Sequence, residues 1–153
     1  MEGVYHLQPS FNEFRVFFNE KALEIRPNLV IRDYEWFPKR KQDFFLVRYG
    51  GNNALYGGIS RQTGALQELA LIREKDGSSN ARLEMVVSSI LILEALQLRL
   101  SMPEKSRLFE QLGLVGKRDG KEKRERVAHL GNITLRHYST EGPGFYAFFL
   151  QYR

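Results

Sequence analysis

The stretch ARLEMVVSSILILEALQLRL, residues 81–100, is the only part of this chain that is apolar on nearly every side at helical spacing. Apolar residues recur three and four positions apart, for example at Leu83, Val86, Val87 and Ile90. Because residues at this spacing lie on one side of an α-helix, the pattern predicts a helix over 81–100. A helix with so little polar surface must be buried, and we expect the rest of the chain to cover it.

Two shorter helices are predicted on either side of this stretch. Ser10 precedes Glu13 by three positions, and Ser101 precedes Glu104 in the same way. This spacing is the capping box, in which each side chain accepts a hydrogen bond from a backbone amide at the start of a helix. We therefore expect helices over 11–23 and 103–112, with Pro27 stopping the first.

Segments rich in aromatic and β-branched residues, separated by clusters of Gly, Asn and Pro, predict the strands. These segments are 29–37, 43–49, 54–60, 65–73, 127–130, 133–138 and 145–152. The uninterrupted apolar run in 43–49 is typical of a strand covered on both sides. The whole chain, 1–153, is thus predicted to be a single α+β domain with a largely antiparallel sheet packed against the long central helix. As an alternative to an entirely antiparallel sheet, a strand-helix-strand crossover would place one pair of parallel strands in it.

The last hairpin gives a prediction of register. Gly131 and Asn132 suit a two-residue turn with glycine in the first central position. Such a turn pairs Leu130 with Ile133 and Ala128 with Leu135. It places those four residues and His137 on one face of the sheet, and it places Val127, His129, Thr134 and Arg136 on the other.

Composition excludes several classes of protein. The 153 residues contain no cysteine, so disulfides, thiolate metal sites and cysteine nucleophiles are excluded. The longest uncharged run in 81–100 covers nine residues, about half of the roughly 20 that a membrane-spanning helix needs. No signal peptide is recognised at the start of the sequence, and the compartment is left open between the cytoplasm and, if a signal has been removed, the periplasm.

The sequence contains no recognisable catalytic or cofactor motif. The Gly-rich segments lack the spacing of a phosphate-binding or dinucleotide-binding loop. His129 and His137 are predicted on opposite faces of their hairpin, and no carboxylate cluster accompanies His6 or either of them. We therefore predict a protein that is not an enzyme and that has no metal site and no cofactor.

Basic residues are the candidate binding groups. The net charge is +5, and residues 117–126 carry six basic and three acidic residues. The candidates in this segment and in the turn before 43–49 are Lys117, Arg118, Lys121, Lys123, Arg124, Arg126, Lys39, Arg40 and Lys41. If the fold brings the two segments together, they can contact phosphates or an acidic surface. The alternative is a solvated loop in which Asp119, Glu122 and Glu125 offset the positive charge.

Our functional prediction is a non-enzymatic domain that binds another protein through sheet edges or loops. No catalytic motif has the required spacing, and the predicted exposed turns are the parts of the chain best suited to recognition. The order of its elements resembles that of small bacterial envelope and toxin-neutralising proteins, which implies a bacterial protein-binding role. The alternative is a module that binds nucleic acid or an acidic surface through 117–126. The oligomeric state is not predicted.

Overall fold

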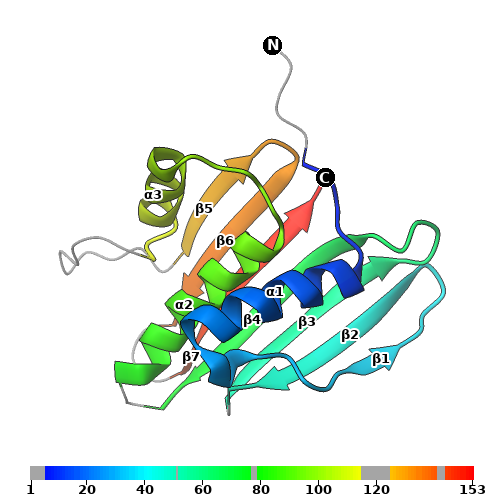
Figure 1. The fold of residues 1–153 in the computed structure, drawn as a ribbon, viewed down its shortest axis with the longest axis horizontal. Helices are drawn as coiled ribbons and strands as arrows, with labels where there is room; N and C mark the ends of the chain where they lie inside the picture. Colours follow the sequence, from blue (N-terminus) through cyan, green and yellow to red (C-terminus); the bar gives the residue numbers. More distant parts are fainter. Residues whose placement is uncertain (1–5, 51, 77–78, 115–124, 141–143) are drawn as a thin grey trace.

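The structure is a computed structural model that describes residues 6–50, 52–76, 79–114, 125–140 and 144–153. In these residues, three α-helices and seven strands form an α+β fold, which confirms the predicted class (Figure 1). The elements are α1 (Phe11–Ile25), a 3-10 turn (Pro27–Leu29), β1 (Glu35–Phe37), β2 (Gln42–Tyr49), β3 (Asn53–Ser60), β4 (Leu66–Lys75), α2 (Ser79–Ala95), α3 (Met102–Gln111), β5 (Glu125–Leu130), β6 (Ile133–Ser139) and β7 (Gly144–Tyr152).

The strands form one sheet in the order β1-β2-β3-β4-β7-β6-β5. Every neighbouring pair in the described residues is antiparallel, so the parallel pair left open by the sequence does not occur there. The crossover that holds α2, α3 and the β5–β6 hairpin returns the chain to β7, which pairs with β4 in the centre. This order places β1 and β5 at opposite edges of the sheet.

Both predicted capping boxes are present. The amide of Glu13 donates to Ser10 Oγ at 3.1 Å, and the amide of Ser10 donates to Glu13 Oε1 at 3.2 Å. Ser101 and Glu104 make the same two bonds at 3.3 Å. The helices therefore begin where the sequence predicts, because these side chains satisfy amides that a helix start leaves without partners.

The prediction of one long central helix over 81–100 is wrong. α2 has 17 residues and ends at Ala95, while α1 has 15, so two helices of similar length cover the sheet. Beyond Ala95, Gln97 and Arg99 have φ values of 52° and 54°, a left-handed conformation that cannot continue a right-handed helix. The leucines that follow Ala95 are mostly buried and continue the apolar pattern, which explains why periodicity alone extended the predicted helix to residue 100.

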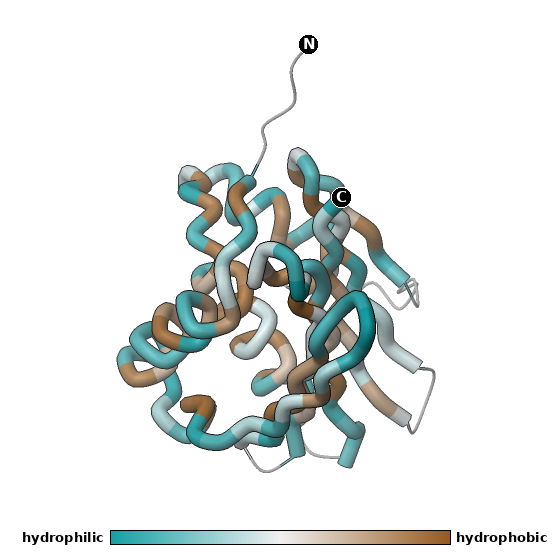
Figure 2. Tube along the Cα trace, turned by 90° about the vertical axis from the view of Figure 1, so that its right-hand side faces the viewer, coloured by the Kyte–Doolittle hydropathy of each residue, from teal (hydrophilic) through white to brown (hydrophobic). Residues whose placement is uncertain are grey.

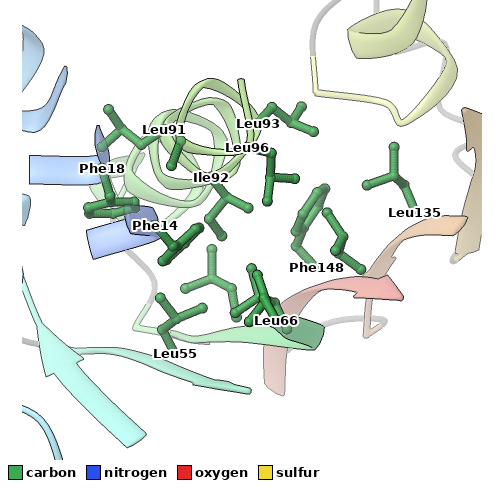
Figure 3. Packing of buried hydrophobic residues seen from close by; sticks show 14 of the residues in the cluster. Phe14, Phe18, Leu55, Leu66, Leu91, Ile92, Leu93, Leu96, Leu135 and Phe148 are labelled. Carbon is green, nitrogen blue, oxygen red and sulfur yellow. The ribbon is translucent and has the colours of Figure 1, made fainter. Parts of the chain in front are cut away.

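The buried side of α2 also differs from the predicted stripe. Leu83 is 46% exposed, whereas Met85, Ser88 and Ile92 are almost fully buried. α2 packs against α1 on one side and the sheet on another, and Figure 3 shows Phe14 and Phe18 of α1 beside Leu91 and Ile92. Because α2 is packed on two sides, its buried residues do not follow a single apolar stripe.

The predicted strand over 29–37 is mostly not a strand. Only β1 forms, and residues before it run as an irregular extended segment. Asn19 of α1 fixes this segment, because its side chain donates to Ile31 O at 2.9 Å and accepts from the Ile31 amide at 2.7 Å. Those bonds satisfy the backbone groups that a neighbouring strand would otherwise use.

The last hairpin has the predicted register. Leu130 pairs with Ile133 and Ala128 with Leu135, and Gly131 takes a φ of 58° in the turn. Ala128, Leu135 and His137 are buried on the face toward the helices, whereas the alternate positions are more exposed. The alternation of β5 and β6 was therefore correctly read from the sequence.

The helices gather on one face of the sheet, and no described helix covers the other face (Figure 2). For this reason β2 is not covered on both sides as predicted: Phe45 and Val47 are buried, while Phe44 is only partly buried and Arg48 is exposed. Within the described residues, no helix is long and apolar enough to cross a membrane.

Candidate functional site

Of the predicted basic residues, the structure describes only Arg126 and residues 39–41, and it places these apart. Lys117, Arg118, Lys121, Lys123 and Arg124 lie outside the described residues. Arg126 lies on β5, where it is partly buried, and residues 39–41 form the exposed turn between β1 and β2. Because β5 and β1 are opposite edges, six strand spacings of about 4.8 Å, or about 29 Å, separate them. Arg126 and residues 39–41 therefore do not form one patch.

Three aromatic side chains lie at the β1 edge of the sheet, with Trp36 on the face toward α1, where Phe11 contacts both it and Tyr34, and Phe37 on the opposite face. Tyr34, Trp36 and Phe37 are 42%, 41% and 41% exposed, although each is a large apolar group. We call these three residues the aromatic edge. Three such neighbours on a three-residue edge strand and its approach are unusual, because exposed apolar groups normally occur singly.

The aromatic edge is held by rings from α1 and β2. The Phe11 ring lies 4.9 Å from Tyr34, 5.7 Å from Trp36 and 4.3 Å from Phe45, measured between centroids. Edge-to-face and tilted contacts at these distances are favourable for aromatic pairs. Phe11 is buried, so it joins two exposed rings to the hydrophobic core.

A cation completes the cluster. The Arg15 guanidinium carbon lies 5.1 Å from the Tyr34 ring centroid and 5.8 Å from the Phe11 centroid. At these distances a cation is attracted to the negative face of the ring. The two exposed rings, Tyr34 and Trp36, are themselves 6.5 Å apart. Together with the Asn19 bonds to Ile31, these contacts hold the Tyr34 and Trp36 rings in place.

The surroundings of the aromatic edge are basic. All residues from 32 to 41 are exposed, and four of them are basic while two are acidic. Arg61 reaches this turn from the β3–β4 loop, where its Nη1 donates to Lys39 O at 2.7 Å and its Nε lies 3.5 Å from Asp43. Residues 39–41, predicted as binding groups, therefore border the aromatic edge.

A cleft of about 360 Å³ opens between α1, the end of α2 and α3. Apolar and charged side chains line it in similar measure, and among them Glu94 and Lys105 form an ion pair of 2.7 Å. Gln97 and Arg99, the two described residues other than glycine that have a left-handed conformation, also line it. The volume is within the range of small-ligand sites.

A polar network is buried where α2 crosses the ends of β3 and β4. Arg73 Nη1 lies 3.4 Å from Glu84 Oε2, and the same carboxylate oxygen accepts from Asn53 Nδ2 at 3.3 Å. Arg73 Nη2 lies 3.3 Å from Asp76 at the end of the network nearest to solvent. The network is not predicted from the sequence, because Glu84 and Arg73 lie in segments that are otherwise largely apolar. Its contacts join α2 to the sheet.

In the part of the chain that the structure describes, no group of three His, Asp or Glu side chains is arranged to hold a metal ion. The aromatic edge was also missed as a site. Its signal was present in the sequence as three aromatic residues between charged ones, but these residues were read only as part of the predicted strand over 29–37. No protein-family model, curated protein or solved structure matches this chain.

Proposed function

We propose that this chain is a non-enzymatic domain that binds another protein at the aromatic edge. The observation that carries the proposal is the exposure of Tyr34 and Trp36, with Arg15 over the Tyr34 ring, and of Phe37 on the other face of the same edge strand. Tyr, Trp and Arg are the residues that contribute most often to the binding energy of protein interfaces. Burying three large aromatic groups removes apolar area from water, which drives association.

The proposed partner presents an apolar patch bordered by acidic residues. The basic turn 39–41 lies directly beyond the aromatic edge, so carboxylates around the partner's patch would face positive charge. Complementary charge at the rim of an interface speeds association and fixes orientation. A bacterial envelope or toxin-neutralising role is the form of this function suggested by the order of the elements.

The test uses immobilised full-length chain to capture proteins from a lysate of the source cells, followed by titration of the purified captured protein. We expect Tyr34→Ala with Trp36→Ala to weaken its affinity at least 100-fold. Tyr56→Ala is the matched control, because Tyr56 is also 41% exposed but lies on the uncovered face of β3. Equal affinity of the double variant and the wild type would overturn the proposal.

A further inference from the structure

The cleft between α1, the end of α2 and α3 has apolar surface on every side. Its six apolar lining residues are Phe17 of α1, Leu93 of α2, Leu98 and Leu100 of the segment between α2 and α3, and Leu108 and Phe109 of α3. Phe17, Leu100 and Phe109 pack against the core but are only partly buried. A ligand with an apolar body would cover the rest of their surface and remove it from water, which favours binding.

The charges that line the cleft are balanced. Three carboxylates and three cations belong to it, and four of these six groups already form two ion pairs. Lys105 Nζ lies 2.7 Å from Glu94 Oε1, and these side chains are 30% and 25% exposed. Lys21 Nζ lies 3.4 Å from Glu24 Oε2 at a more exposed position on α1. The cleft therefore has no excess of either sign that would favour a ligand of one charge.

Glu20 and Arg99 are the other two charged residues of the cleft, and among the described residues neither has an ion pair. Glu20 lies one helical turn after Phe17 on α1, so their side chains are neighbours. Arg99 follows Leu98 in the segment between α2 and α3. A ligand with one charge would pair only one of these groups, whereas a ligand with both charges would pair Glu20 and Arg99 together.

The backbone at Arg99 is held in a costly conformation. Gln97 and Arg99 have φ values of 52° and 54°, in the left-handed region that residues other than glycine seldom adopt. Leu98 between them is buried, whereas Gln97 and Arg99 are exposed and line the cleft. Such backbone conformations concentrate at binding sites, where a side chain is needed at a fixed place.

We propose that this cleft binds a free α-amino acid with a large apolar side chain. The ammonium group of the ligand pairs with Glu20, its carboxylate pairs with Arg99, and its side chain covers Phe17 and Phe109. The planar guanidinium group of arginine suits a carboxylate. The volume of about 360 Å³ is near the lower end for small-ligand sites, which suits a molecule of this size. The cleft shares no residue with the aromatic edge, so the proposal does not depend on the protein interface.

The test is an NMR titration of the isotope-labelled full-length chain with L-phenylalanine and L-leucine. We expect saturable binding, with shifts of the amide resonances around the cleft. Three analogues each lack one feature of the ligand: phenylpropionate has no ammonium group, phenethylamine has no carboxylate, and glycine has no apolar side chain. Each should bind at least tenfold more weakly than L-phenylalanine.

Two variants assign the two charges. Arg99→Gln should weaken L-phenylalanine at least tenfold and leave the affinity for phenethylamine unchanged, because that analogue has no carboxylate to lose its partner. Glu20→Gln should weaken L-phenylalanine to a similar degree and leave phenylpropionate unchanged. Both side chains are exposed, so we expect both variants to fold. If either does not, Arg99→Lys and Glu20→Asp keep the charges, and each should still weaken L-phenylalanine several-fold.

Control variants separate the cleft from general effects of charge. Arg107→Gln and Glu110→Gln remove exposed charges of α3 that do not line the cleft, and both should bind L-phenylalanine like wild type. The proposal is overturned if neither amino acid binds, if an analogue that lacks one charge binds as tightly as L-phenylalanine, or if the Glu20 and Arg99 variants bind it like wild type.

Discussion

Replacing Glu84 with Gln removes one charge from the buried network while keeping the size of the side chain. The side chains of Arg73 and Glu84 are 4% and 11% exposed, and their closest atoms are 3.4 Å apart. At an effective dielectric constant of about 20, this attraction is worth about 5 kcal/mol before the cost of desolvation is subtracted. Because Asp76 still contacts Arg73, we expect the free energy of unfolding to fall by about 3 kcal/mol, the lower end for breaking a buried pair.

Urea unfolding followed by circular dichroism measures this change. The matched control is Glu125→Gln, which breaks the ion pair between Glu125 and Arg136. That pair is shorter, at 3.0 Å, but its side chains are 47% and 54% exposed, so we expect a loss of less than about 1 kcal/mol. A larger loss for Glu84→Gln than for Glu125→Gln would show that the burial of an ion pair, and not its length, determines how much it stabilises the fold.

A double variant tests the pairing itself. Arg73→Met with Glu84→Met replaces both charges by apolar groups, and we expect it to lose less stability than the sum of the two single variants. A Glu84→Gln loss below about 0.5 kcal/mol, or additive effects of the two methionine substitutions, would show that water already screens this pair and would refute the reasoning.

Three other predictions concern the core, the segment before β1 and pH. Leu91→Ala should lower the free energy of unfolding by about 2 to 5 kcal/mol in the same urea assay, because Leu91 is fully buried; a loss below about 1 kcal/mol would contradict its place in the core. Asn19→Ala removes the two hydrogen bonds from the Asn19 side chain to the backbone of Ile31, so the free energy of unfolding should fall by about 1 to 3 kcal/mol and amide exchange over 30–37 should become faster. Unchanged exchange over 30–37 would show that Asn19 does not hold this segment. Since the folded pKa of His137 is about 4, below its unfolded value of 6.5, the unfolded chain binds more protons between these values, and stability should fall by up to about 3 kcal/mol as the pH drops from 6.5 to 4. His137→Gln should remove that part of the slope in urea midpoints measured across this pH range, and an unchanged slope would contradict the assignment.

Local patterns predicted much of the fold. Capping boxes at Ser10 and Ser101 located two helix starts, and Gly131 with the alternation around it gave the full register of β5 and β6. These features are decided by neighbours within a few residues, so the sequence contains them directly.

Features that depend on distant contacts were not predicted. The end of α2 is set by the left-handed residues Gln97 and Arg99, and the irregular path before β1 is set by Asn19 from another element. The same holds for the candidate sites. The contacts of Phe11 with Tyr34 and Trp36 join α1 to the β1 edge, and the separation of Arg126 from residues 39–41 follows from the strand order.

The most direct test of the proposed protein-binding function is hydrogen–deuterium exchange of the full chain with and without its purified captured partner. The account predicts that the partner slows exchange over residues 30–41, which include the aromatic edge and the basic turn, and leaves exchange in β5 and β3 unchanged. Slower exchange in β5 or β3, with residues 30–41 unchanged, would contradict it.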